Sequence, residues 1–245
     1  MTERNGIRKV AVFLQDLHGG GAERMMLELA GKLADRSHEV ELVLVRREGA
    51  YLDRVPGNLR LRILGTRRML NSIGALARYL RRERPDILIT ALTHVNVGAL
   101  LAAALARVGT RVVVTEHTLI TQYLETLAGV GLRLAYRLVP WTYPRAAAVV
   151  AVSGGAADEL ARFARMPRER VDVIYNGIIT PELLRRAEEP CRHPWLAPGQ
   201  PPVIMGAGRL VEMKDFATLI RAFALVRAQR PARLLIAGEG EEREP

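Results

Sequence analysis

Residues 10–24, which read VAVFLQDLHGGGAER, hold the local pattern that decides the fold. The first five of these residues are apolar, as in a buried β-strand, and a helical pattern begins near Ala22. Between them, Gly19, Gly20 and Gly21 allow a tight turn and leave backbone N–H groups uncovered before a helix N-terminus. Such a turn suits contact with an anion or a sugar hydroxyl. A plain strand-to-helix turn of any α/β protein would have the same pattern.

Strand and helix patterns alternate along the chain from this turn onward. The dinucleotide-binding fingerprint G-x-G-x-x-G is excluded, because the position of its third glycine is occupied by Arg24. Alternating strands and helices predict a doubly wound α/β fold with a parallel sheet. The expected strands are residues 10–14, 40–45, 59–64, 86–90, 111–115, 147–152 and 171–174, and the expected helices are 22–35, 70–83, 98–107 and 154–164.

Composition narrows the class of protein. The chain has 245 residues, of which 49% are hydrophobic, so a globular protein with a hydrophobic core is expected. Its formal net charge of +10 would suit anionic partners. Neither a basic cluster interleaved with aromatics nor zinc-finger spacing occurs, which argues against nucleic acid as a partner. Cys191 is the single cysteine, so no internal disulfide forms. No signal peptide and no apolar run of about 18 residues is present, and we expect a cytoplasmic protein.

Polar residues follow three of the expected strands. Because ligands of open α/β sheets bind at the carboxyl ends of the strands, these residues are expected to converge at one edge. A loop over residues 91–96 is expected to precede the helix 98–107. The polar groups are Gly19, Gly20 and Gly21 after the first strand, Thr93, His94 and Asn96 after the fourth, and Glu116, His117 and Thr118 after the fifth.

A shift in composition divides the chain into two domains. We expect a Rossmann-like N-terminal domain over residues 1–180, a proline-rich linker over 181–201, and the start of a second domain over 202–245. The last part holds one strand–helix–strand unit of about forty residues, too few to bury a core of their own. The second domain is therefore expected to be truncated, unless this unit packs against something else.

The segment 118–143 allows two interpretations. Its apolar and aromatic residues, among them Tyr123, Leu134 and Trp141, lie beside Arg133 and Arg137. A basic amphipathic helix of this kind could lie on an anionic membrane. A helix that packs against the sheet would show the same apolar stripe.

Six short motifs, taken in order, resemble the retaining glycosyltransferases of family four. They are GGAER at 20–24, EH at 116–117, VS at 152–153, VIYNG at 173–177, GRL at 208–210 with Lys214, and GEG at 238–240. The resemblance implies the GT-B architecture, in which two Rossmann-like domains face each other across a cleft. The segments 91–96 and 111–118 look most like bacterial members that act on envelope polysaccharide, exopolysaccharide or lipopolysaccharide.

The resemblance also implies roles for individual residues. His117 would sit by the transferred sugar, while Arg209 and Lys214 would hold the donor diphosphate, and these three are the expected catalytic residues. Glu23 and Asn176 also have structural explanations. Glu23 would cap its helix and complement the helix dipole, and Asn176 would serve the Asn-Gly turn. The expected substrate-binding residues are Gly19, Gly20, Gly21, Glu23, Thr93, His94, Asn96, Asn176, Gly208, Gly238 and Gly240.

The expected reaction moves a sugar from a nucleotide-diphosphate sugar to a glycan or lipid-linked acceptor, with possible peripheral contact at an anionic membrane. Cationic side chains would stabilise the departing diphosphate, so neither a metal nor a cofactor is expected. The family's glutamate pair in a later helix is missing, so this chain alone is expected to be weakly active or inactive. The alternatives are a nucleotide-sugar epimerase on the same scaffold and a non-catalytic module that binds glycan or lipid.

Overall fold

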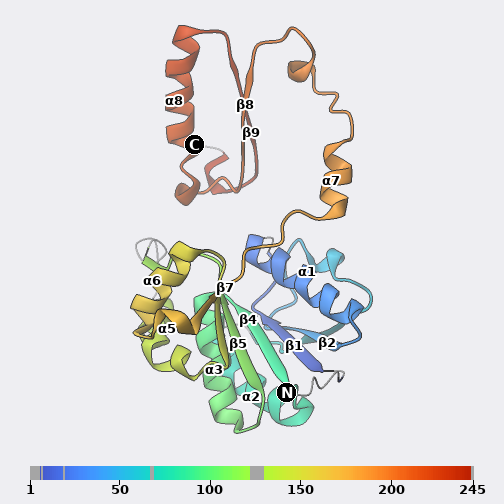
Figure 1. Cartoon of the computed structure of the whole chain (residues 1–245), viewed down its shortest axis with the longest axis vertical. Helices are drawn as coiled ribbons and strands as arrows, with labels where there is room; N and C mark the ends of the chain where they lie inside the picture. Colours follow the sequence, from blue (N-terminus) through green and yellow to red (C-terminus); the bar gives the residue numbers. More distant parts are fainter. Residues whose placement is uncertain (1–5, 7, 19, 67–68, 122–129, 244–245) are drawn as a thin grey trace. The chain divides into compact units, whose positions relative to one another are not determined.

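The computed structural model describes residues 6, 8–18, 20–66, 69–121 and 130–243. The chain divides into two compact units, Met1–Ile178 and Ile179–Pro245. Helices and strands alternate throughout both units (Figure 1).

A seven-stranded sheet forms the first unit, and all of its strands are parallel. The strands are rich in apolar residues because helices cover the sheet and both of its faces are buried. The spatial order of the strands is β3-β2-β1-β4-β5-β6-β7. In sequence they are β1 (Lys9–Leu14), β2 (Glu39–Leu44), β3 (Arg60–Ile63), β4 (Ile87–Ala91), β5 (Arg111–Glu116), β6 (Ala148–Ala151) and β7 (Val171–Val173).

Two apolar clusters form the core, one on each face of the sheet. Side chains alternate along a strand, so Val12 of β1 belongs to one cluster and Phe13 to the other. Helix α1 packs on the Val12 face of the sheet, and helices α2, α3, α5 and α6 pack on the Phe13 face (Figure 1). The helices of this unit are α1 (Gly21–Asp35), α2 (Met69–Glu83), α3 (Thr93–Ala106), α5 (Val130–Thr142) and α6 (Gly154–Ala164), with the 3-10 turns η1 (Leu52–Arg54), η2 (Tyr143–Arg145) and η3 (Arg168–Arg170).

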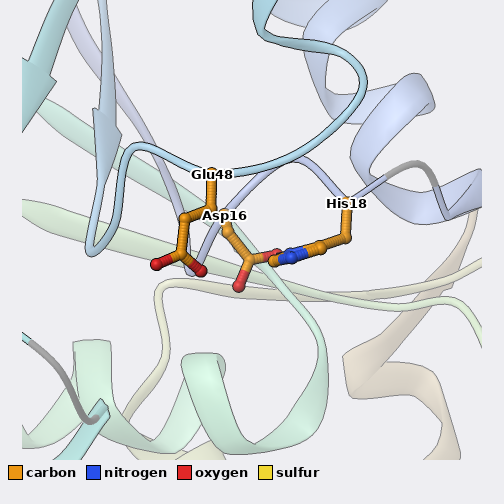
Figure 2. Close-up of side chains that lie close together, drawn as sticks. All are labelled: Asp16, His18 and Glu48. Carbon is orange, nitrogen blue, oxygen red and sulfur yellow. The ribbon is translucent and has the colours of Figure 1, made fainter.

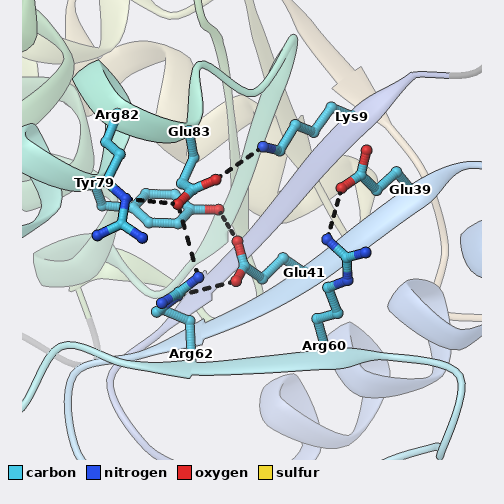
Figure 3. Close-up of polar contacts among 8 residues, drawn as sticks. All are labelled: Lys9, Glu39, Glu41, Arg60, Arg62, Tyr79, Arg82 and Glu83. Carbon is cyan, nitrogen blue, oxygen red and sulfur yellow. Dashed lines mark hydrogen bonds and ion pairs between the residues drawn. The ribbon is translucent and has the colours of Figure 1, made fainter.

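A polar network ties α2 to the strands of this sheet (Figure 3). Glu41 of β2 is 7% exposed, and its carboxylate accepts a hydrogen bond of 2.7 Å from the Tyr79 hydroxyl and one of 3.1 Å from Arg62. Glu83 pairs with Lys9 at 3.0 Å and with Arg62 at 3.7 Å. Burial and the bond to Glu41 raise the pKa of Tyr79, which keeps its hydroxyl protonated. The network stabilises the fold, since each of its charges has a partner.

The second unit contains one strand–helix–strand motif. Strands β8 and β9 are parallel neighbours, with Val203 opposite Arg233. Among the described residues of this unit, Ala232 alone is buried. The elements are α7 (Pro181–Ala187), η4 (Pro194–Leu196), β8 (Val203–Ala207), η5 (Glu212–Lys214), α8 (Phe216–Gln229), β9 (Arg233–Ala237) and η6 (Glu241–Arg243).

The observed elements follow the sequence pattern closely, with two differences. Helix α3 begins at Thr93, so the expected loop 91–96 and the expected helix start at residue 98 are wrong. Leu92, the N-cap of the helix, has a φ of 76°, a positive value that is strained for a residue other than glycine. The segment 181–201, expected as a linker, contains α7 and η4.

Candidate functional site

The carboxyl ends of β1, β4 and β5 are adjacent because these strands are neighbours in the sheet. Residues that follow the three strands therefore meet at one edge, which we call the carboxyl edge. Its described residues are 15–18, 20–23, 92–96 and 115–118. Open α/β sheets bind their ligands at such an edge.

The glycine turn contributes the N-terminus of α1 to this edge. Gly20 is the N-cap of the helix, and Gly21 is exposed. A side chain at Gly20 would collide with the carboxylate of Glu23, which bends back over the turn. This carboxylate stabilises the positive end of the helix dipole. Gly19 lies outside the described residues.

Asp16 organises the residues that follow β1. It is 6% exposed. One carboxylate oxygen of Asp16 lies 2.7 Å from Nδ1 of His18, and the other forms an ion pair with Arg46. Burial opposes ionisation of Asp16, but hydrogen bonds from His18, Arg46 and Gln15 outweigh it and lower its pKa. Asp16 therefore stays negatively charged at pH 7.

Asp16, His18 and Glu48 lie close enough together to be considered as metal ligands (Figure 2). Their ligand atoms fall within 4.8 Å of one another. However, Arg46 pairs with Asp16 and also lies 3.3 Å from the carboxylate of Glu48, so a guanidinium already offsets part of the negative charge of these two carboxylates. Asp16, His18, Arg46 and Glu48 therefore form a cluster of ion pairs. That the protein binds no metal stays a prediction.

His94 lies in the first turn of α3, beside the end of β1. Its Nε2 atom is 3.0 Å from Oε1 of Gln15. Burial lowers the pKa of His94, and the nearby charge of Asp16 only partly opposes this effect. His94 is therefore a neutral hydrogen-bonding group at pH 7. Leu92, directly before this turn, has the strained backbone described above, and such strain is often stored at functional sites.

Glu116, the last residue of β5, is the most deeply buried carboxyl group of the edge. It is 1% exposed and accepts hydrogen bonds from the Tyr143 hydroxyl, from Nδ2 of Asn96 at 3.1 Å, and from Oγ1 of Thr93 at 3.1 Å. Burial raises the pKa of Glu116 to about 7, although these three donors act against the rise. Burial and the neighbouring carboxyl raise the pKa of Tyr143 as well.

The positions of Thr93 and Asn96 differ from those expected of substrate-binding loop residues. Thr93 is 2% exposed and Asn96 is 0% exposed, and both side chains point to Glu116. Asn96 also donates to the backbone oxygen of Thr115 at 2.9 Å. With this burial, both residues hold the end of β5 in place and present no free polar atom at the surface. Direct contact with a substrate fits His94 better.

His117 follows β5 and is half-buried. Its Nε2 atom lies 3.1 Å from Oγ1 of Thr115, whose hydroxyl also donates to the backbone oxygen of Thr90 at 3.0 Å. Its Nδ1 atom is buried and has no hydrogen-bond partner in the described part of the chain. Burial lowers the pKa of His117, so the ring is neutral at pH 7.

The glycines of the second unit are explained by backbone contacts. A side chain at Gly238 would meet the backbone oxygen of Gly208, and one at Gly240 would meet that of Leu210. The two turns are joined by hydrogen bonds from Gly208 N to Ala237 O at 3.0 Å and from Leu210 N to Glu239 O at 2.9 Å. These glycines therefore allow two turns to approach closely.

Arg209 and Lys214 are exposed near the carboxyl end of β8. Among the ion pairs between described residues, none involves either side chain. Asn176 lies in the first unit, in the segment after β7, and its backbone oxygen accepts a hydrogen bond from Ile178 N at 2.9 Å. Their contacts with a substrate stay predictions.

Sequence reasoning missed Gln15, Asp16, Arg46, Thr115 and Tyr143. Asp16 follows an apolar strand, and this was a signal that could have been used. Tyr143 carried no such signal, because it lies 27 residues from Glu116 in the sequence.

A model of glycosyltransferase family 4 matches residues 19–181. Among solved structures, HepE from Anabaena, crystallised with UDP and glucose, matches with a TM-score of 0.65 and 20% identity. The match covers 95% of this chain and 61% of the HepE chain. No curated protein sequence gives a significant match.

Two further structures have the same fold. Sucrose-phosphate synthase from Thermosynechococcus elongatus matches with a TM-score of 0.67 and 15% identity, over 97% of this chain and 64% of that chain. UDP-N-acetylglucosamine 2-epimerase from Rickettsia bellii matches with a TM-score of 0.52 and 13% identity, over 94% and 62%. The expected α/β fold of the GT-B type is confirmed. The chain spans 61% of the length of HepE.

Proposed function

The chain belongs to glycosyltransferase family 4, and from this premise we propose that it forms the acceptor side and the first part of the donor side of a retaining glycosyltransferase. The enzyme would move a sugar from a nucleotide-diphosphate sugar to a glycan or lipid-linked acceptor in envelope polysaccharide synthesis. The observation that carries the proposal is the carboxyl edge, where His94 and His117 lie neutral beside a glycine turn.

Neutral imidazoles are suited to sugar hydroxyls, which both donate and accept hydrogen bonds. Glu23 supports the same assignment for the glycine turn. Its carboxylate lies over Gly20 and would repel a phosphate, whereas it would accept a hydrogen bond from a hydroxyl. The turn is therefore assigned to the sugar or the acceptor.

The donor diphosphate requires positive charge, because breaking the bond between sugar and phosphate leaves negative charge on the departing group. Arg209 and Lys214 supply it in this proposal. They are exposed, without an ion pair among the described residues, and they lie near the two turns that Gly238 and Gly240 allow to approach closely. An arginine and a lysine in such a position bind diphosphate oxygens by charge-assisted hydrogen bonds.

Calorimetric titration with UDP-, GDP- and ADP-glucose tests the donor site. The double variant Arg209→Ala, Lys214→Ala should bind the preferred sugar nucleotide at least about 100-fold more weakly, the loss expected for two charge-assisted hydrogen bonds. Arg227→Ala, which removes another exposed cation from α8, is the matched control and should bind as the wild type does. Equal weakening by both changes would refute a specific diphosphate site.

An epimerase of nucleotide sugars is the second candidate, and the fold likeness to the Rickettsia bellii enzyme supports it. An epimerase needs no acceptor. Incubation with UDP-sugar alone, followed by chromatography of the products, separates the two activities. An epimeric sugar nucleotide formed without acceptor favours the epimerase.

A module that binds lipid is the third candidate. Helix α5 exposes 54% of Leu134 and 67% of Trp141, with Arg137 on the same helix. Among the described helices, none has both the length and the apolar character that a membrane span requires. Flotation with anionic and neutral liposomes tests peripheral contact. Binding to anionic liposomes without any affinity for sugar nucleotides would favour the module.

A further inference from the structure

A chain of hydrogen bonds joins the end of β1 to the first turn of α3. The carboxylate of Asp16 accepts a hydrogen bond of 3.1 Å from Nε2 of Gln15, and Oε1 of Gln15 lies 3.0 Å from Nε2 of His94. Arg46 and His18 contact the same carboxylate. The amide of Gln15 therefore lies between a carboxylate that three side chains hold in place and an imidazole ring.

The charge of Asp16 fixes the orientation of the Gln15 amide. An ionised carboxylate only accepts hydrogen bonds, so the NH₂ group of Gln15 faces Asp16 and the amide oxygen faces His94. The reverse orientation would place two acceptor oxygens beside each other. Because the amide oxygen also only accepts, Nε2 of His94 carries a hydrogen and donates it to Gln15. In the neutral ring, Nδ1 is then an acceptor.

Nδ1 of His94 is open to solvent. Within the described part of the chain, the ring makes a hydrogen bond to Gln15 alone, and Nδ1 does not belong to the buried atoms that lack a partner. His94 is only partly buried, in the first turn of α3. A ligand at the carboxyl edge can therefore reach this nitrogen.

We propose that Asp16 and Gln15 are positioning residues that keep His94 in the tautomer protonated at Nε2, so that Nδ1 accepts a hydrogen bond from a sugar hydroxyl. The opposite tautomer would leave two acceptors, Oε1 of Gln15 and Nε2 of His94, facing each other at 3.0 Å. That arrangement is unfavourable, because neither group would then be hydrogen-bonded. The sugar as ligand rests on the proposed function, whereas the tautomer rests only on Asp16 and Gln15.

The direction of these bonds separates the proposed role from a structural one. A structural link between β1 and α3 needs a bond between Gln15 and His94 in either direction. Asp16→Asn tests the direction, since an asparagine amide donates as well as accepts and would let the Gln15 amide turn around. This variant should keep the link and lose the single tautomer.

Nuclear magnetic resonance of ¹⁵N-histidine-labelled protein above pH 7 tests the tautomer without any ligand, and His94→Gln identifies the resonances. In the wild type, the His94 ring proton should be attached to Nε2 and protected from solvent exchange. Gln15→Met, which has a similar length and no amide, should lose the protection and show both tautomers. Gln15→Glu, which keeps an acceptor oxygen, should retain the proton at Nε2. Gln229→Met, at an exposed glutamine of α8, is the matched control and should behave as the wild type does.

A ring proton on Nδ1 in the wild type would overturn the proposal, as would a single, fully protected Nε2 tautomer in Gln15→Met. The same result in Asp16→Asn would overturn the role of Asp16. The backbone amide spectrum shows whether each variant is folded. If Asp16→Asn is unfolded, the wild type, Gln15→Met and Gln15→Glu decide the question.

Titration with UDP-glucose and with methyl α-D-glucoside tests the ligand contact. A shift of the Nδ1 resonance of His94 with the glucoside assigns the contact to the acceptor, and a shift with UDP-glucose alone assigns it to the donor sugar. Gln15→Met should bind the effective probe about two- to tenfold more weakly, the loss expected for one misplaced hydrogen bond.

Binding of either probe that leaves the Nδ1 resonance unchanged would refute the ligand contact. A complete lack of binding of both probes would contradict the proposed function, while the ring-proton measurement still decides the role of Asp16 and Gln15.

Discussion

Replacement of Glu116 by glutamine should remove a pH-dependent cost from the folded protein. The amide has the same shape as the carboxyl group, so its oxygen can accept from Tyr143 and Asn96. Its NH₂ group faces Thr93, whose hydroxyl can turn and accept. Glu116→Gln therefore keeps the hydrogen bonds and deletes the ionisation.

The magnitude follows from the pKa of Glu116, which burial raises from 4.5 to about 7. A raised pKa means that the folded state binds the proton more tightly than the unfolded chain does. The stabilisation is complete below about pH 4.5 and is lost as the pH rises through 7. The difference between the two pKa values corresponds to roughly 3 kcal/mol.

Urea denaturation of both proteins between pH 4.5 and 8 measures this difference. The unfolding free energy of Glu116→Gln, relative to that of the wild type, should rise by roughly 3 kcal/mol across the range. The lowered pKa values of His94 and His117 affect both proteins equally and cancel in the comparison. Glu169→Gln, at an exposed glutamate of η3, is the control and should show no such rise. A difference between Glu116→Gln and wild type that stays constant with pH would refute the reasoning.

Other substitutions test the fold. Tyr79→Phe leaves the buried Glu41 carboxylate without its 2.7 Å donor and should lower the unfolding free energy by about 1–3 kcal/mol in urea denaturation. Ser153→Ala removes the N-cap acceptor of the Ala156 N–H at 3.2 Å and should cost about 1 kcal/mol by the same assay. Gly238→Ala places a methyl group against a backbone oxygen that cannot move away easily. In limited proteolysis, the second unit of this variant should be cleaved faster than the second unit of the wild type.

Much of the fold could be predicted from local pattern. The apolar strand before Gly20 and the helix after it appear where expected, and Ser153 caps α6 as its position indicated. These features depend on residues close together in sequence, such as a side-chain oxygen and an N–H three residues later. The same holds for the order in which strands and helices alternate.

The edge at which the candidate residues gather was predicted correctly, and the local structure around Asn96 was not. The sequence placed His94, Asn96 and His117 at one edge of the sheet, because parallel strands share that edge. It also suggested a loop around Asn96, since polar residues commonly favour turns. In the structure Asn96 is helical and buried, because Glu116 offers it a hydrogen-bond partner.

By itself, then, the sequence determined the alternation of strands and helices and the glycine turn, because each depends on neighbours a few positions apart. It also determined the edge at which polar residues gather, because the carboxyl ends of parallel strands share one edge. Only the tertiary structure decided which of those residues are partners. Tyr143 reaches Glu116 across 27 positions, and Thr115 reaches the backbone of Thr90 across 25. Burial then sets the protonation of Glu116 and His117, since desolvation depends on everything that surrounds a side chain.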